Sequence, residues 1–136
     1  MSDSLVEARW QSGSLRFEAE GRSGISVVLD GDSGEGPSPP ETLLISLAAC
    51  MGVDVVEILN KMRVPLDALV VRVEADRRPE PPRRFTAIRM LYRVEGVPEA
   101  DHPKLERAVT LSRETYCSVL HTLRPDLDLA IRIETA

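Results

Sequence analysis

The sequence predicts an α+β protein with the element order βββ-α-ββ-α-β. Short segments in which apolar and polar residues alternate indicate six strands, and two longer segments with apolar residues at helical spacing indicate two helices. The chain has 136 residues, the usual size of one domain, and contains no repeat or low-complexity tract. We therefore expect a single domain over residues 1–136.

Three strands joined by tight hairpins are expected first. Apolar and polar residues alternate through 5–9, 15–19 and 25–29, and glycine and serine residues separate these segments. The following stretch from Asp30 to Pro37 contains three glycines and no large apolar side chain, which is typical of a loop. A crossover loop is thus predicted between the third strand and the next element.

The central element is predicted to be a long helix. Ser38 has the properties of its N-cap, Pro39 of its first helical residue, and Glu41 of the residue that completes a capping box. Apolar residues then fall on nearly every side of the helix from Leu43 to Leu59, which indicates a buried core helix rather than an amphipathic surface helix. We expect it to end at Val64-Pro65, since proline removes a backbone donor.

The remaining chain predicts a hairpin, a second helix and a closing strand. Alternation through 69–76 and 85–94, with a proline-rich break between them, indicates the hairpin. Asp101 is a plausible N-cap of the second helix, which is predicted to continue without interruption to the vicinity of Leu123. A final strand is expected over 127–133, after Pro125 has ended that helix.

The composition favours a folded cytoplasmic protein. Apolar residues make up 43% of the chain and charged residues 29%, which excludes a disordered or fibrous protein. The net charge of −5 and the absence of a lysine or arginine cluster argue against nucleic acid as a partner. The longest uncharged apolar stretch, Thr42 to Val53, is shorter than the ~20 residues that cross a bilayer, so no membrane segment is expected.

The two cysteines are too few for a disulfide scaffold, and in a reducing compartment each is either a core filler or a reactive thiol. Cys50 lies in the long apolar helix, on the same predicted face as three charged residues, Asp54, Glu57 and Lys61.

Cys117 lies in the second predicted helix. Arg113 and His121 stand four residues to either side of it, and on a regular helix both would share its face. A cation on each side would lower the pKa of the Cys117 thiol, whereas ordinary solvated side chains would leave it inert.

The sequence contains no motif that indicates a metal site, a nucleotide site or a serine hydrolase. The possible zinc ligands are Cys50, Cys117, His102 and His121, without any paired metal-ligand spacing, so no metal is expected. No dinucleotide fingerprint, phosphate loop or nucleophile elbow is present, so we expect no cofactor.

Two segments, taken together, resemble the OsmC/Ohr family of thiol peroxidases. One runs from Gly36 through the helix start to Cys50 and on to Asp54-Val55-Val56, and the other is Tyr116-Cys117-Ser118-Val119. The resemblance covers essentially the whole chain, and the Asp54-Val55-Val56 run is most similar to an OsmC-like branch of the family.

The resemblance implies an OsmC-like fold and an intertwined homodimer, in which the long helix of each chain packs against its partner and two active sites lie at the interface. It further implies a peroxidase of oxidative-stress defence that acts preferably on organic hydroperoxides. By resemblance, Cys50 is the peroxidatic thiol, which becomes a sulfenic acid, and Cys117 is the resolving thiol. An external dithiol, such as a lipoyl group, would reduce the resulting disulfide.

Family members that act on organic hydroperoxides also use an arginine from an early strand loop and a glutamate at the helix start. Arg22 is the best match to the arginine, with a solvated hairpin residue as the alternative. The glutamate is expected ten residues before the cysteine, where this chain has Pro40. Glu41 stands one residue later, so its two candidate roles are the capping box and the site.

Two alternatives to a peroxidase stay open at this point. A non-catalytic relative would bind a small apolar or thiol-containing ligand in the interface pocket while its cysteines stay reduced. A purely structural dimer would use both cysteines as core filler.

Overall fold

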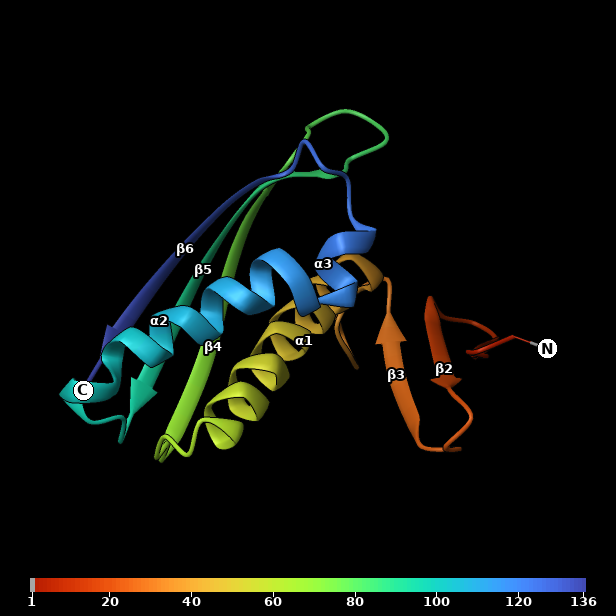
Figure 1. Cartoon of the computed structure of the whole chain (residues 1–136). Coiled ribbons are helices and arrows are strands. Elements are labelled where there is room, and N and C mark those ends of the chain that lie inside the picture. Colours follow the sequence, from red (N-terminus) through yellow and green to blue (C-terminus); the bar gives the residue numbers. More distant parts are fainter. Residues whose placement is uncertain (1) are drawn as a thin grey trace. The chain divides into compact units, whose positions relative to one another are not determined.

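The computed structural model of the chain describes residues 2–136 (Figure 1). Its elements follow the predicted order βββ-α-ββ-α-β, which confirms the α+β class. The chain divides into two compact units, of which the first ends at Leu44 and the second runs from Ile45 to Ala136, so the boundary falls within the long helix of the sequence. The expectation of one domain over residues 1–136 stays a prediction.

The first unit contains an antiparallel sheet of three strands in the order β1-β2-β3. They span Glu7–Trp10, Arg16–Glu20 and Ser26–Asp30. Trp10 pairs with Phe17, which pairs with Leu29. Because side chains alternate between the two faces of a sheet, these residues share an apolar face. That face is largely uncovered within the unit, since 60% of Trp10 and 56% of Val27 are exposed.

The loop after β3 is ordered by the buried carboxylate of Asp30. It accepts hydrogen bonds from the backbone N–H groups of Asp32 at 2.9 Å, Gly34 at 3.2 Å and Glu35 at 2.9 Å. These bonds, led by that from Asp32, hold the pKa of Asp30 below its usual value. The predicted loop is therefore confirmed, with a defined conformation.

Helix α1, Pro39–Lys61, begins with the capping box that the sequence predicts. The Glu41 N–H donates to the Ser38 hydroxyl at 3.3 Å, and the Ser38 N–H donates to the Glu41 carboxylate at 3.2 Å. The helix ends slightly before Val64-Pro65, because Arg63 adopts a left-handed conformation with φ of 58°.

Within one chain, α1 is buried along one stripe rather than on all sides as expected. Leu47, Met51, Val55 and Leu59, spaced four residues apart, have no more than 1% of their surface exposed. The opposite side is apolar but open, with 55% of Val53 exposed. By length and composition alone α1 is apolar enough to cross a membrane, a test that core helices of water-soluble proteins also pass.

The second unit places α1 and α2 (His102–Leu111) on one face of a second sheet (Figure 1). Strands β4 (Ala68–Arg77) and β5 (Phe85–Glu95) form the predicted hairpin, and β6 (Asp128–Thr135) pairs with β5 in parallel. Alternate residues of β5 face the helices and are buried: Ile88, Met90, Tyr92 and Val94.

The second predicted helix is not continuous, which corrects the sequence analysis. A short 3₁₀ turn, η1 (Glu99–Asp101), precedes α2, and a π-helical turn, η2 (Ser112–Tyr116), follows it. Cys117 then leaves the helical conformation, with φ of −71° and ψ of 101°, before α3 (Ser118–Thr122) begins. Asp101 occupies the N-cap position of α2, but its side chain makes no capping hydrogen bond.

We predict that Ser38→Ala lowers the free energy of unfolding by about 0.5–2 kcal/mol, because the substitution leaves the Glu41 N–H at the start of α1 without its acceptor. Urea unfolding followed by circular dichroism measures this loss. Ser38→Asp, which keeps an acceptor at the N-cap, is the matched control and should retain most of the stability. Equal losses in both variants would contradict the capping role.

Candidate active site

The middle of α1 and the break between η2 and α3 bring the two cysteines together. Both are free thiols; Cys50 is partly exposed and Cys117 is fully buried. The Cys50 sulfur lies 3.9 Å from the Ser118 hydroxyl, and the two thiols are within hydrogen-bonding reach of each other. The predicted pair of site cysteines therefore does form one cluster, although they are far apart in the sequence.

Hydrogen bonds make Cys50 the more acidic thiol. The largest effect comes from the Val119 backbone N–H, which holds the pKa of Cys50 below its usual value. The Cys117 thiol and the Ser118 hydroxyl act in the same direction. Partial burial and the negative charge of Asp54 oppose them. The hydrogen bonds prevail, so Cys50 ionises more readily than an ordinary cysteine to the thiolate that nucleophilic chemistry requires.

The pKa of Cys117 is displaced in the opposite direction. Burial raises it to about 11, and the neighbouring Cys50 adds to this effect. A hydrogen bond at 3.3 Å from the Leu120 N–H to the Cys117 sulfur opposes the rise without cancelling it. At neutral pH Cys117 is therefore a protonated thiol next to a more acidic one.

Of the two alternatives left open for Arg113 and His121, activation of the Cys117 thiol is contradicted by the structure. Because η2 and the break interrupt the helix, four-residue spacing no longer puts these side chains on the face of Cys117. Arg113 instead donates to the Leu129 carbonyl at 3.1 Å, and the His121 ring lies 2.9 Å from the Arg113 carbonyl. The pKa of Cys117 is accordingly raised and not lowered.

Ser112 and Tyr92 are two polar residues at the site to which the sequence analysis assigned no role. The fully buried Ser112 hydroxyl donates to the Asp54 carboxylate at 2.8 Å. Ser112 lies on the apolar stripe of its helix, and a polar residue at such a position requires a partner on a facing element. This signal was available in the sequence, whereas the partner could not be identified without the fold.

Tyr92 adds a buried hydroxyl beside this cluster. Its pKa is raised mainly by burial, and the charges of Cys117 and Asp54 add to the rise. Among residues 2–136, no side chain or backbone group pairs with that hydroxyl. Tyr92 therefore stays protonated as a potential hydrogen-bond donor near the thiols.

The other two candidate residues belong to the first unit. Arg22 lies between β2 and β3 and donates to the Ser2 carbonyl at 2.8 Å. Glu41 engages Ser38 in the capping box. The observed contacts of Glu41 are those of a cap, and a role of either residue at the thiolate stays a prediction.

The charged face of α1 is confirmed. Asp54, Glu57 and Lys61 line one cavity of about 410 Å³ together with Leu111 and Tyr116. In the described part of the chain, no three metal-ligating side chains gather into a cluster that could hold an ion.

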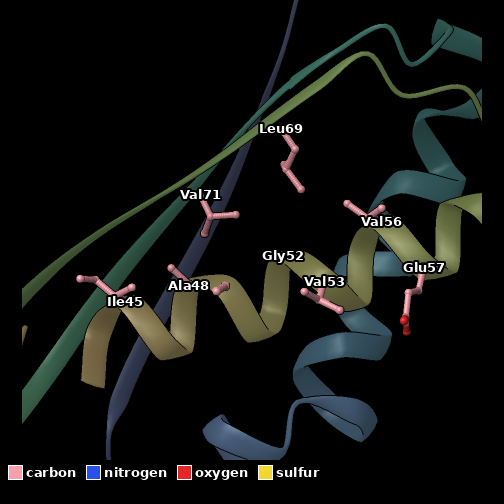
Figure 2. A pocket seen from close by; sticks show the side chains of 9 residues that line it. Ile45, Ala48, Gly52, Val53, Val56, Glu57, Leu69 and Val71 are labelled. Carbon is pink, nitrogen blue, oxygen red and sulfur yellow. The ribbon is translucent and has the colours of Figure 1, made fainter. Parts of the chain in front are cut away.

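A neighbouring side of α1, which shares Glu57 with the charged face, borders an apolar groove of about 560 Å³, here called the α1–β4 groove (Figure 2). Figure 2 shows Ile45, Val53 and Val56 of α1 on one side and Leu69 and Val71 of β4 on the other. Ala48, Ala49, Gly52 and Glu57 complete the lining. The small residues Ala48, Ala49 and Gly52 leave room for another surface to approach α1.

Comparison with known proteins gives one family and two close relatives. Residues 31–132 match the sequence model of a family described as OsmC-like protein. Protein YhfA of Escherichia coli is 41% identical over 115 residues, which are 84% of each chain. A hypothetical protein from Aquifex aeolicus is 33% identical, with a TM-score of 0.87 over 100% of this chain and 98% of its own.

A more distant structure shares the fold. The organic hydroperoxide resistance protein OhrB of Bacillus subtilis has a TM-score of 0.61 at 18% identity, with 98% of both chains covered.

We predict that iodoacetamide alkylates the two cysteines over different pH ranges, because only thiolates react. In Cys117→Ser, the rate at Cys50 should reach half its maximum below the ordinary cysteine pKa of ~8.5. In Cys50→Ser, the midpoint for Cys117 should lie well above that value, toward about 11. Alkylation rates measured by mass spectrometry from pH 6 upward give both midpoints.

Unfolding in urea is the control, since both variants should then react alike with an ordinary thiol pKa. Equal alkylation of the two folded variants at neutral pH would contradict the assignment of Cys50 as the more acidic thiol.

Proposed function

Because the chain belongs to the OsmC-like protein family, we propose that it is a cysteine-based peroxidase that reduces organic hydroperoxides in oxidative-stress defence. The OsmC/Ohr family is generally linked to peroxidase activity, and OhrB is named as an organic hydroperoxide resistance protein. The cytoplasm, whose reducing conditions suit two free thiols, is the proposed location.

One observation carries the proposal: two free thiols lie together, and their pKa values are displaced in opposite directions. A two-cysteine peroxidase needs one thiol that is readily ionised to attack the peroxide. It needs a second thiol that stays protected until the first has been oxidised. Cys50 meets the first requirement through the Val119 N–H, and Cys117 meets the second through burial.

The proposed reaction has two steps within the protein. The Cys50 thiolate attacks one oxygen of the hydroperoxide, the O–O bond breaks, and the alkoxide takes a proton and leaves as the alcohol. Cys50 is now a sulfenic acid. The Cys117 sulfur attacks the Cys50 sulfur, the S–S bond forms, and the hydroxyl group leaves as water with the Cys117 proton. An external dithiol reduces the disulfide.

Arg22 is proposed to stabilise the Cys50 thiolate when peroxide is bound, as the resemblance to the family implies. A guanidinium is always protonated and so favours a nearby thiolate. For Glu41 we propose the capping role as its main contribution, because its three hydrogen bonds with Ser38 all serve the start of α1.

A homodimer is proposed as the working form. OsmC/Ohr proteins are known dimers, and each unit of this chain has an apolar surface that a second copy can cover. In the first unit this surface is the apolar face that includes Trp10 and Phe17. In the second unit it is the α1–β4 groove. Covering apolar area of this kind is the usual source of association free energy.

We predict that reduced protein mixed with one equivalent of cumene hydroperoxide loses two free thiols per chain, because Cys50 is oxidised and Cys117 then condenses with it. In Cys117→Ser only one thiol is lost, and a sulfenic acid can be trapped with dimedone. In Cys50→Ser the loss should become slow, because Cys117 stays protonated. Free thiols are counted over seconds to minutes.

Arg22→Ala in the same series tests the proposed guanidinium, and Arg72→Ala is the matched control, because Arg72 is an exposed arginine of β4 paired with Glu74 at 3.3 Å. A slower first step only in Arg22→Ala supports its role. Unchanged thiols in the parent protein would overturn the peroxidase and favour the ligand-binding alternative.

We predict that Val53→Asp raises the dimer dissociation constant by at least about tenfold, because each copy would bury an unpaired carboxylate in the α1–β4 groove. Val70→Asp is the matched control: Val70 is 54% exposed, like Val53 at 55%, but lies one residue off the groove residues of β4. Sedimentation equilibrium at several concentrations gives both constants, and equal values would contradict this interface.

A further inference from the structure

Two hydrogen bonds connect α1 to the backbone of Cys117. The Asp54 carboxylate accepts the Ser112 hydroxyl at 2.8 Å, and the Ser112 carbonyl accepts the Cys117 N–H at 2.9 Å. Asp54 stands one helical turn after Cys50. Helix α1 therefore contacts the segment 112–118 at both of its ends: Asp54 contacts Ser112, and Cys50 contacts Ser118.

The hydrogen bond between Ser112 and Asp54 favours one position of η2 because it is buried. Ser112 has no exposed surface, and the neighbouring helix residues that are also buried are apolar: Leu105, Ala108 and Val109. A buried hydroxyl is costly unless it is paired, and pairing with a carboxylate is stronger than pairing with a neutral acceptor. The bond thus favours one position of the start of η2 over others.

The second bond determines where the helix breaks. In a regular α-helix the Ser112 carbonyl would accept from residue 116, whereas here it accepts from Cys117, one residue further. Cys117 then turns out of the helix, and its sulfur accepts the Leu120 N–H. The same turn aims the Val119 N–H at Cys50. The position of Cys117 relative to Cys50 thus depends on Ser112.

We propose that Asp54 and Ser112 are positioning residues for disulfide formation, holding Cys117 where its sulfur can attack an oxidised Cys50. The proposal rests on the proposed peroxidase function for its natural oxidant. Formation of the disulfide can also be driven by diamide, which makes the two proposals separable.

The sign of the Asp54 charge excludes the simpler explanation that Asp54 activates the thiols. A carboxylate opposes the ionisation of a neighbouring thiol, and Asp54 does so at both Cys50 and Cys117. The benefit of Asp54 must therefore come from its hydrogen bond. Besides the two thiols, the charged and titratable groups around Asp54 are Glu57 and Lys61 on α1, Tyr116 on η2 and Tyr92 on β5.

The step that Asp54 and Ser112 assist conserves atoms and electrons with either oxidant. With peroxide, the Cys117 sulfur displaces the hydroxyl group from the Cys50 sulfenic acid, and water leaves. With diamide, the Cys50 thiolate adds to the N=N bond, and the Cys117 sulfur then displaces the reduced hydrazine from the Cys50 sulfur. Both routes end in the same S–S bond, so both depend on the position of Cys117.

Three variants of the full chain test the proposal. Ser112→Ala removes the donor, Asp54→Ala removes the acceptor, and Asp54→Asn keeps an acceptor oxygen while removing the charge. Thr110→Val is the control, because it removes a hydroxyl of α2 outside this pair of hydrogen bonds. Rapid quenching gives the rate of Cys50 oxidation and the rate of disulfide formation separately, and thermal melting by circular dichroism verifies folding.

We expect Ser112→Ala and Asp54→Ala to slow disulfide formation by about 10- to 100-fold with both oxidants, because small misplacements of reacting atoms carry costs of this size. Asp54→Asn should restore most of the rate, and Thr110→Val should resemble the parent. With peroxide, the slow variants should accumulate a sulfenic acid that dimedone traps. If Ser112→Ala does not fold, the contrast between Asp54→Ala and Asp54→Asn decides.

A pH profile separates positioning from a merely structural effect. With Cys117→Ser in the background, Asp54→Asn should shift the alkylation of Cys50 to lower pH, since it removes an opposing charge. Ser112→Ala should shift that profile the other way, to higher pH, because a loosened turn weakens the hydrogen bond from the Val119 N–H to Cys50. Disulfide formation in Ser112→Ala at the parent rate with diamide overturns the proposal. Normal diamide kinetics without any reaction with peroxide would instead overturn only the peroxidase function.

Discussion

The packing of one stripe of α1 against the second sheet is the constraint on which the site depends. Leu47, Met51, Val55 and Leu59 repeat every four residues and fix the rotation of the helix about its axis. With about 100° between successive residues, one flank must then carry Cys50 and Asp54 toward η2 and α3. The other flank carries the residues of the α1–β4 groove. The rotation of α1 about its axis therefore determines the position of both the thiol site and the α1–β4 groove.

The difference between the two thiols arises mainly from the backbone and from burial. Within the second unit, the Val119 N–H is the largest influence that favours the Cys50 thiolate, and exclusion from water keeps Cys117 protonated. The first effect requires that the helix be interrupted at Cys117, since a continuous helix would use the Val119 N–H for its own hydrogen bonds. The break in the helix is thus part of the chemistry.

Local signals in the sequence were sufficient for most of the fold but not for the break. Ser38 and Glu41 predict the helix start correctly, because a capping box involves only residues three positions apart. Periodicity also identified the strands. Periodicity failed at 112–117, because the π-helical turn there is stabilised by Asp54, which lies far away in the sequence on α1. For the same reason the sequence analysis wrongly put Arg113 and His121 on the face of Cys117. The prediction that Cys50 and Cys117 belong to one site came only from the resemblance to a family.

The parallel pairing of β6 with β5 has a consequence for biosynthesis. A parallel connection cannot be a short hairpin, and here it encloses α2, η2, Cys117 and α3. On the ribosome, β4 and β5 can pair as a local hairpin, but β6 must be synthesised before the segment that carries Cys117 is anchored at both ends. Until then only the contacts with α1 hold this segment, so the two thiols reach their fully anchored arrangement late in the life of the new polypeptide.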